Sequence, residues 1–246
     1  MKQLGLIGRT LGHSFSAKYF TEKFERESLA EQFSYELYEL PAIEDVEKFI
    51  SSTPNLLGFN VTIPYKQQIL PYLDDLSDEA RQIGAVNCVK ILADRRRVGY
   101  NTDVDGVRLS LDRLLGERCA KSALVLGSGG ASQAVRFVLQ ERGIDSLVVS
   151  RSKVSGDITY EELSAEVMAA NELIINASPV GMYPYVEECP NIPYHLLTSN
   201  HRLFDLVYNP PITLFMERGM AHGAQAISGL EMLHAQAESA WRIWNE

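Results

Sequence analysis

The sequence lacks the features that mark membrane proteins and disulfide-stabilised secreted domains. No apolar run in its 246 residues approaches the roughly 20 residues that a helix needs to span a bilayer. Cysteine is scarce, and Cys88, Cys119 and Cys189 are widely spaced with no Cys-x-x-Cys pair among them. An odd number of cysteines without such spacing argues against a disulfide framework or a structural zinc site. We therefore expect three reduced thiols.

Basic residues are also few. Lys and Arg total 23 against 32 Asp and Glu, and the formal net charge of −9 opposes nonspecific binding to nucleic acid. The five histidines show no metal-ligand spacing, so no metal is expected. The 46% of hydrophobic residues is ordinary for a globular protein, and residues 1–9 read as a first strand rather than a signal peptide. We expect a soluble cytoplasmic protein, a monomer or homodimer, without a nucleic-acid or membrane partner.

Strand-like and helix-like segments alternate along the chain, which is typical of α/β proteins with largely parallel sheets. Two sheets are more consistent with this length than one. In the first half the predicted strands are residues 3–7, 33–40, 57–61 and 86–92, and the predicted helices are residues 16–27, 43–51, 65–73 and 77–83. The charged stretch Asp94-Arg-Arg-Arg97 is interpreted as a solvated hairpin tip, with a basic binding patch as the alternative.

The alternation restarts after a helix predicted over residues 104–115, which links the two halves. The predicted strands of the second half are residues 123–126, 147–150, 173–176, 203–206 and 224–227, and the predicted helices are residues 131–142, 161–170 and 230–244. Neither half contains an internal repeat or a low-complexity segment.

The most informative stretch is Gly58-Phe-Asn-Val-Thr-Ile-Pro-Tyr-Lys66, in which a strand rhythm breaks at Pro64 and is followed at once by a lysine. Proline suits the first turn of a helix, so the pattern places Lys66 near a predicted helix N-terminus. The helix dipole favours anions there, and a lysine in that place indicates a bound anion or a partner carboxylate. Downstream, Gly99-Tyr-Asn-Thr-Asp103 supplies such a carboxylate.

A glycine turn, Gly127-Ser-Gly-Gly130, follows an apolar strand and precedes a predicted helix. Glycines allow the backbone to approach a pyrophosphate, and the helix N-terminus offers free N–H donors. The alternative is a strand-to-helix turn that binds no ligand.

At the end of the next predicted strand, a protein that prefers NAD would show Asp or Glu for the ribose hydroxyls. The sequence instead has Ser150-Arg151-Ser152-Lys153. A guanidinium binds a phosphate in bidentate fashion, which favours NADP. The alternative for Arg151 is a plain surface charge.

Read together, these stretches resemble the shikimate dehydrogenase family. Further motifs agree in type and order: Gly12-His-Ser-Phe-Ser16, Gly84-Ala-Val-Asn87, Asn176-Ala-Ser-Pro-Val-Gly-Met182, Tyr208-Asn-Pro210 and Gly229-Leu-Glu-Met-Leu-His-Ala-Gln236. The resemblance covers nearly the whole chain. It implies an N-terminal α/β substrate domain (residues 1–103, completed by residues 229–246), a Rossmann-like NADP-binding domain (residues 104–228) and an active site in the cleft between them. The implied activity is the reversible NADPH-dependent reduction of 3-dehydroshikimate to shikimate.

The resemblance assigns catalysis to Lys66 and Asp103. Hydride transfer to a ketone builds negative charge on the carbonyl oxygen, so a positioned acid is needed to stabilise and protonate it. A lysine performs both tasks, while Asp103 would hold the ammonium and bond to a substrate hydroxyl. The alternative for this pair is an ordinary salt bridge at a domain junction. How the proton reaches the oxygen is not settled by residue identity.

By the same resemblance Ser14 and Ser16 bind the substrate carboxylate, although a helix N-cap also explains one of them. Arg9 and Ala17 replace prolines that are common in the family around this loop, so its backbone is expected to be less rigid. The other implied substrate-binding residues are Asn60, Thr62, Asn87, Tyr208 and Gln236. The implied cofactor-binding residues are Gly127, Ser128, Gly129, Gly130, Ala131, Ser150, Arg151, Ser152, Ala177, Ser178, Gly229 and Met232.

The segment after Arg151 is short. Residues 152–157 leave only six residues before the strand-like Ile158-Thr-Tyr160, whereas a parallel crossover needs about a dozen. The helix that the family has here is therefore predicted to be missing, with residues 158–160 irregular or only marginally paired. Arg151, with or without Lys153, would then carry the preference for NADP.

Three alternatives stay open. A relative that also oxidises quinate and prefers NAD is the rival enzyme, and Arg151 weighs against it. A non-catalytic sensor of nicotinamide cofactor or shikimate is the rival binding protein, and the presence of both Lys66 and Asp103 weighs against that. Cys88 stands where the family has Thr, either as a packing substitution or as an oxidant-sensitive thiol.

Overall fold

The computed structural model describes residues 1–12 and 14–246, and its chain divides into two compact units. The first unit is Met1–Thr102 together with Ala237–Glu246, and the second is Asp103–Gln236. Asp103 and residues 229–236 thus lie in the second unit, whereas the sequence boundaries assigned them to the first. Each unit is built on its own six-stranded sheet.

The sheet of the first unit has the strand order β2-β1-β3-β5-β6-β4. Its strands are β1 (Lys2–Gly8), β2 (Phe33–Glu39), β3 (Leu56–Val61), β4 (Asp75–Leu76), β5 (Cys88–Ile91) and β6 (Arg97–Tyr100). Strands β1, β2 and β3 are parallel, whereas β5 is antiparallel to both β3 and β6. The turn between β5 and β6 is closed by a bond from the Leu92 N–H to the Arg96 carbonyl, so the predicted hairpin tip is confirmed.

The helices of the first unit are α1 (Phe15–Arg26), η1 (Ile43–Asp45), α2 (Val46–Ser52), η2 (Leu70–Tyr72) and α3 (Asp78–Ile83). The helix predicted over residues 65–73 is wrong, because residues 63–69 form turns and only the 3-10 helix η2 follows. Pro71 explains the error. Inside an α-helix it would remove one hydrogen bond and clash with the preceding turn, and it lies instead in the first turn of η2.

The C-terminal part of α8 (Leu230–Asn245) completes the core of the first unit. Trp244 packs with Phe20 and donates its indole N–H to the Val89 carbonyl at 3.0 Å. Gly58 is required beneath this ring, since a Cβ there would lie 2.4 Å from Trp244 Cδ1. A segment from the end of the chain therefore stabilises the strand that leads toward Lys66.

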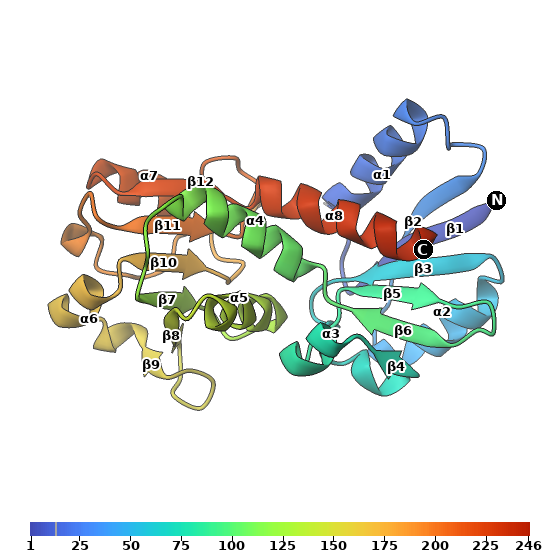
Figure 1. Cartoon of the computed structure of the whole chain (residues 1–246), viewed down its shortest axis with the longest axis horizontal. Helices are drawn as coiled ribbons and strands as arrows, with labels where there is room; N and C mark the ends of the chain where they lie inside the picture. Colours follow the sequence, from blue (N-terminus) through green and yellow to red (C-terminus); the bar gives the residue numbers. More distant parts are fainter. Residues whose placement is uncertain (13) are drawn as a thin grey trace. The chain divides into compact units, whose positions relative to one another are not determined.

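The sheet of the second unit has the order β12-β11-β10-β7-β8-β9, and all its strands are parallel (Figure 1). They are β7 (Ser122–Leu126), β8 (Asp145–Ser150), β9 (Ile158–Thr159), β10 (Leu173–Asn176), β11 (Arg202–Asp205) and β12 (Gln225–Ser228). The central strands are almost wholly buried, as expected for a parallel sheet with helices on its faces. This is the doubly wound dinucleotide-binding order, in which the order of the strands reverses between β7 and β10 while all of them stay parallel.

The helices of the second unit are α4 (Asp103–Leu115), α5 (Gly130–Glu141), η3 (Tyr160–Glu162), α6 (Ala165–Ala170), η4 (Tyr194–Leu196), α7 (Leu214–Ala221) and the start of α8. The predicted helix over residues 161–170 is divided, because Ser164 caps α6 by accepting the Val167 N–H. Within the described residues, 1–12 and 14–246, no helix is both long enough and apolar enough to cross a membrane.

The short connection between β8 and β9 is confirmed to lack a helix. Only two residues of the predicted edge segment pair, Ile158 with Val149 and Thr159 with Ser150. Strand β9 nevertheless pairs with β8 in parallel. The short connection is long enough because β9 pairs only with the last two residues of β8.

Candidate active site

The carboxyl ends of the six parallel strands in the second unit define one edge of its sheet, where ligands of doubly wound proteins bind. The predicted cofactor-binding residues follow these ends: Gly127 to Ala131 after β7, Ser150 to Ser152 at the end of β8, Ala177 and Ser178 after β10, and Gly229 and Met232 after β12. One edge therefore carries all of them.

Gly127 occupies the turn at the end of β7. Its φ of 110° is a conformation that side chains with a Cβ rarely adopt, and its N–H donates to the Val149 carbonyl at 2.9 Å. A Cβ on Gly127 would lie 3.2 Å from Ser178, in the turn after β10. Glycine thus allows the two loops at the reversal point to approach closely.

Helix α5 begins at this turn without a side-chain cap. Gly129 is its N-cap residue, and its first turn contains no acidic residue. By contrast, α1, α3, α6 and α7 are each capped by a Ser or Thr hydroxyl. A Cβ on Gly129 would meet open space. The N–H groups at the start of α5 are therefore suited to a dinucleotide pyrophosphate, and the residues present fit that group.

At the end of β8, three serines order the chain. Ser150 Oγ accepts the Ser152 N–H at 3.3 Å and lies 2.7 Å from Ser155 Oγ. Gly156 packs against them, since its Cβ would lie 2.6 Å from that of Ser150. Arg151 is exposed at the start of this loop. Ser155 was not predicted as a site residue, because nothing in the sequence indicates that it contacts Ser150 five residues earlier.

A buried polar cluster lies at the ends of β10 and β11. Asp205 accepts hydrogen bonds from Asn176 Nδ2 at 2.9 Å, Thr213 Oγ1 at 2.5 Å and the Val207 N–H at 3.0 Å. Asn176 Oδ1 in turn accepts the Ser178 N–H and hydroxyl. Burial raises the pKa of Asp205 to about 6 against the opposing effect of these bonds. Asp205 and Thr213, which sequence reasoning did not single out, hold the turn that carries Ser178.

The last predicted residues of the second unit lie around the start of α8. Gly229 is in close backbone contact, because a Cβ would lie 2.2 Å from the Leu206 carbonyl oxygen. Met232 is buried and packs on Gly106 of α4. Tyr208 is half-buried, and Gln236 Nε2 donates to the Leu233 carbonyl at 3.1 Å. Met232 therefore has a packing role that is independent of any cofactor.

In the first unit, Ser14 is the N-cap of α1, and its hydroxyl accepts the Ser16 N–H at 3.3 Å. Burial raises the pKa of Tyr35 in β2, and the nearby Ser16 hydroxyl opposes that rise. Capping thus explains Ser14, as the sequence allowed, but it does not involve the Ser16 hydroxyl.

Tyr35 joins this helix to the polar residues of β3. Its hydroxyl donates to Asn60 Oδ1 at 2.8 Å, and Asn60 Nδ2 donates to the Asn87 carbonyl at 3.0 Å. Asn87 Nδ2 then donates to Thr102 Oγ1 at 3.1 Å. The structure therefore connects Asn60 and Asn87 through buried hydrogen bonds. Tyr35 and Thr102 are the links that the sequence did not reveal.

Lys66 lies in the turns after β3 and is half-buried. Its carbonyl accepts the Val86 N–H at 2.7 Å, which fixes it beside the segment leading to Asn87. The neighbouring Tyr65 is buried and donates its hydroxyl to the Leu40 carbonyl. Thr62 is half-buried just before this turn. No α-helix begins here, so the prediction that Lys66 lies at a helix N-terminus is wrong. The position of Lys66 is set instead by tertiary contacts such as the bond from the Val86 N–H.

Asp103 is the first residue of α4 and has only 4% of its surface exposed. A carboxylate is favoured at this end of a helix by the dipole and the free N–H groups. Asp103 belongs to the second unit, directly after Thr102 of the first.

Comparison with known proteins agrees with this geometry. Residues 6–89 match the model of the shikimate dehydrogenase substrate binding domain. A shikimate dehydrogenase (NADP(+)) from Methanococcus maripaludis is 36% identical over 260 residues, covering 99% of this chain and 91% of the relative. The chain belongs to the shikimate dehydrogenase family.

Solved structures of the family superimpose over nearly the whole chain. The shikimate 5-dehydrogenase of Thermus thermophilus, in complex with NADP(H) and shikimate, gives a TM-score of 0.86 at 30% identity, covering 99% of this chain and 93% of that one. A quinate dehydrogenase of Corynebacterium glutamicum, in complex with NAD, also gives 0.86, at 28% identity with the same coverage.

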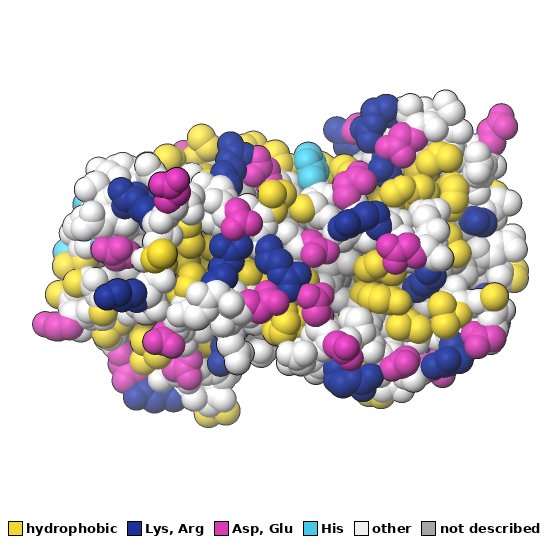
Figure 2. Space-filling view, in the orientation of Figure 1, with side chains coloured by type: hydrophobic (Ala, Val, Ile, Leu, Met, Phe, Trp, Pro, Cys, Tyr) yellow, Lys and Arg dark blue, Asp and Glu magenta, His cyan; other side chains and the backbone are white. Residues whose placement is uncertain are grey.

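Three further features of this shikimate dehydrogenase family member concern metal ligands, thiols and surface charge. Among the described residues no group of His, Cys, Asp and Glu has the arrangement of a metal site. Cys88 is fully buried, and burial raises the pKa of its thiol, which makes it a packing residue and not a reactive thiolate. On the face shown in Figure 2, basic and acidic side chains are interspersed, consistent with the net charge of −9.

Proposed function

We propose that this chain is an NADP-dependent shikimate dehydrogenase that reversibly reduces 3-dehydroshikimate to shikimate. One observation carries the proposal: in this member of the family, the glycine turn from Gly127 to Gly130 and Arg151 lie at the carboxyl edge of a doubly wound sheet. NADPH, when bound, supplies the hydride. The open glycine turn at the start of α5 would hold its pyrophosphate, and Arg151 would bind its 2′-phosphate.

The hydrogen-bonded residues of the first unit would bind the substrate. Ser14 and Ser16 are neutral donors for its carboxylate, and Asn60, Thr62 and Asn87 are suited to its ring hydroxyls. The orientation of Asn60 and Asn87 is supported by their bonds to Tyr35 and Thr102, which leave these two side chains few alternative positions. Tyr208 and Gln236 of the second unit would complete this set.

Lys66 and Asp103 would carry the chemistry. As the hydride arrives, the ketone oxygen gains negative charge, and a nearby ammonium stabilises that charge and donates the proton. Asp103, at the start of α4, would hold the ammonium and accept a hydrogen bond from a substrate hydroxyl. In the reverse direction Lys66 would take the proton back from the hydroxyl that is oxidised.

The test mixes the purified protein with NADPH and 3-dehydroshikimate and follows the loss of reduced-nicotinamide absorbance. Parallel reactions replace NADPH with NADH, and reverse reactions offer shikimate or quinate with NADP. Turnover with NADPH that far exceeds turnover with NADH is the expected result. Absence of turnover with every combination would overturn the proposal.

An NAD-preferring quinate dehydrogenase is the second candidate, supported by the likeness to the quinate dehydrogenase from Corynebacterium glutamicum. The exposed Arg151 at the end of β8 weighs against it. Faster oxidation of quinate with NAD than of shikimate with NADP would decide for this alternative. For either activity we expect a cytoplasmic monomer or homodimer.

A further inference from the structure

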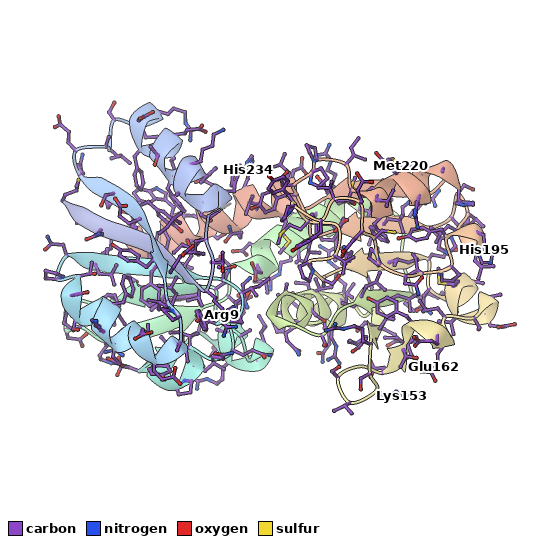
Figure 3. All side chains as sticks on the ribbon, turned by 180° about the vertical axis from the view of Figure 1, so that it is seen from behind. Arg9, Lys153, Glu162, His195, Met220 and His234 are labelled. Atoms are coloured by element: carbon purple, nitrogen blue, oxygen red, sulfur yellow. The ribbon has the colours of Figure 1, made fainter. Side chains whose placement is uncertain are left out.

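An ion pair joins the short connection between β8 and β9 to the 3-10 helix that follows β9. Lys153 comes from the loop after β8, and Glu162 is the last residue of η3, directly after β9 (Figure 3). Lys153 Nζ lies 2.6 Å from Glu162 Oε1. Their side chains are 64% and 39% exposed, so both are accessible to a ligand.

Glu162 is fixed in place by a second bond. Its Oε2 accepts the Thr159 N–H at 2.9 Å, which forms a capping box at the start of η3. Thr159 pairs with Ser150, so Glu162 lies at the same carboxyl edge as the end of β8. The hydrogen bond from Lys153 lowers the pKa of Glu162, which keeps its carboxylate ionised at neutral pH.

Arg151 directly follows Ser150, which pairs with Thr159, the residue before η3. Burial raises the pKa of Tyr160, the first residue of η3, and the positive charge of Arg151 opposes that rise. In doubly wound proteins the residues after the second strand meet the ribose 2′ position, and here that strand is β8. Arg151, Lys153 and Glu162 therefore gather where a 2′-phosphate would lie.

We propose that Glu162 competes with the 2′-phosphate of NADP for Lys153 and thereby limits the preference for NADP over NAD. The inference rests on the proposed function, because it takes NADP as the ligand of this edge. Binding of the phosphate by Lys153 requires the ammonium to leave a carboxylate that the capping box holds. Exposed ion pairs are weak, so the exchange is possible, and its effect corresponds to about a two- to fivefold change in affinity.

The experiment measures dissociation constants of NADPH and NADH by nicotinamide fluorescence, without substrate. Glu162→Gln keeps an oxygen to accept the Thr159 N–H and removes the charge that holds Lys153. We expect NADPH to bind about two to five times more tightly than in wild type, with NADH unchanged. Glu161→Gln is the matched control, because it removes the adjacent charge and leaves the pair of Lys153 and Glu162 intact.

The same substitution in a Lys153→Met background separates competition from simple charge repulsion. The gain from Glu162→Gln should then fall by at least half, because no ammonium is released. A gain of equal size in both backgrounds, an equal gain for NADH, or no gain would overturn the inference. If the inference fails in one of these ways but the wild-type protein binds NADPH, the proposed function is unaffected. If the wild-type protein binds neither NADPH nor NADH, the proposed function itself is contradicted.

Discussion

Asn87 holds Thr102 by both ends of its carboxamide: Oδ1 accepts the Thr102 N–H at 2.7 Å, and Nδ2 donates to the Thr102 hydroxyl at 3.1 Å. Both residues are buried in the first unit. The pair ties the loop before β5 to the residue that precedes Asp103, and it fixes the orientation of the Asn87 amide.

Thr102→Val should remove one partner of the buried Asn87 amide while keeping the shape of the side chain. We expect the free energy of unfolding to fall by about 1–3 kcal/mol, together with a higher KM for shikimate. Urea unfolding and steady-state kinetics measure the two effects. Thr53→Val is the control, since Thr53 is also buried in this unit and its hydroxyl donates to the Phe49 carbonyl, within one helix. Equal changes of KM in both variants would contradict a positioning role for Thr102.

Lys66→Ala should lower turnover far more than it weakens substrate binding, because the ammonium interacts most strongly with the charge of the transition state. Loss of one such donor typically costs about 2.7–4 kcal/mol, or a factor of roughly 10²–10³ in kcat. Lys90→Ala, in the same unit, is the control for removing a half-buried lysine. Near-normal turnover by a folded Lys66→Ala protein would exclude Lys66 from the mechanism.

Replacing Ser14 and Ser16 together by alanine should raise the KM for shikimate strongly and leave NADP affinity nearly unchanged. Ser14 also caps α1, so a stability loss of about 0.5–2 kcal/mol is expected in addition. Ser77→Ala, which removes the cap of α3 in the same unit, should lose comparable stability without the KM effect. If the double variant behaves like Ser77→Ala, capping is the whole role of these serines.

Arg151→Ala should bring the specificity constants for NADP and NAD close to parity, because the connection after β8 contains no helix and its other basic residue, Lys153, is paired with Glu162. The measurement compares kcat/KM for the two cofactors in wild type and variant. Arg118→Ala is the control, since Arg118 is an exposed arginine before β7, at the opposite edge of the sheet. A large ratio that survives in Arg151→Ala would mean that other residues bind the phosphate.

Asp205 predicts a pH dependence of stability. Its pKa is raised from 3.8 to about 6 in the folded state, so between these values the folded protein binds more protons than the unfolded chain. The contribution of Asp205 to stability is therefore greatest below pH 4 and decreases as pH rises through 6, by about 3 kcal/mol in total. Urea unfolding of wild type and Asp205→Asn from pH 4 to 7 measures it as a falling difference between the two proteins. A constant difference over this range would contradict the raised pKa.

Features that depend on neighbours in sequence were predictable. The glycine turn from Gly127 to Gly130, the strand before it, the helix after it and the missing helix after Arg151 all follow from local composition or from the length of chain available. The helix predicted over residues 65–73 is wrong, although Pro71 within that range is itself a local sign that an α-helix cannot continue there.

What the sequence by itself determined was the α/β class, the family, and the residue types that reduction of a ketone needs. Only the tertiary structure decided which of these groups hold one another. Tyr35 meets Asn60, Asn176 meets Asp205, and Lys153 meets Glu162 because the strands that carry or precede these residues pair in a particular order and register. A buried hydrogen bond between distant residues leaves no local pattern, since each partner alone is an ordinary polar residue that requires a partner when folding removes water.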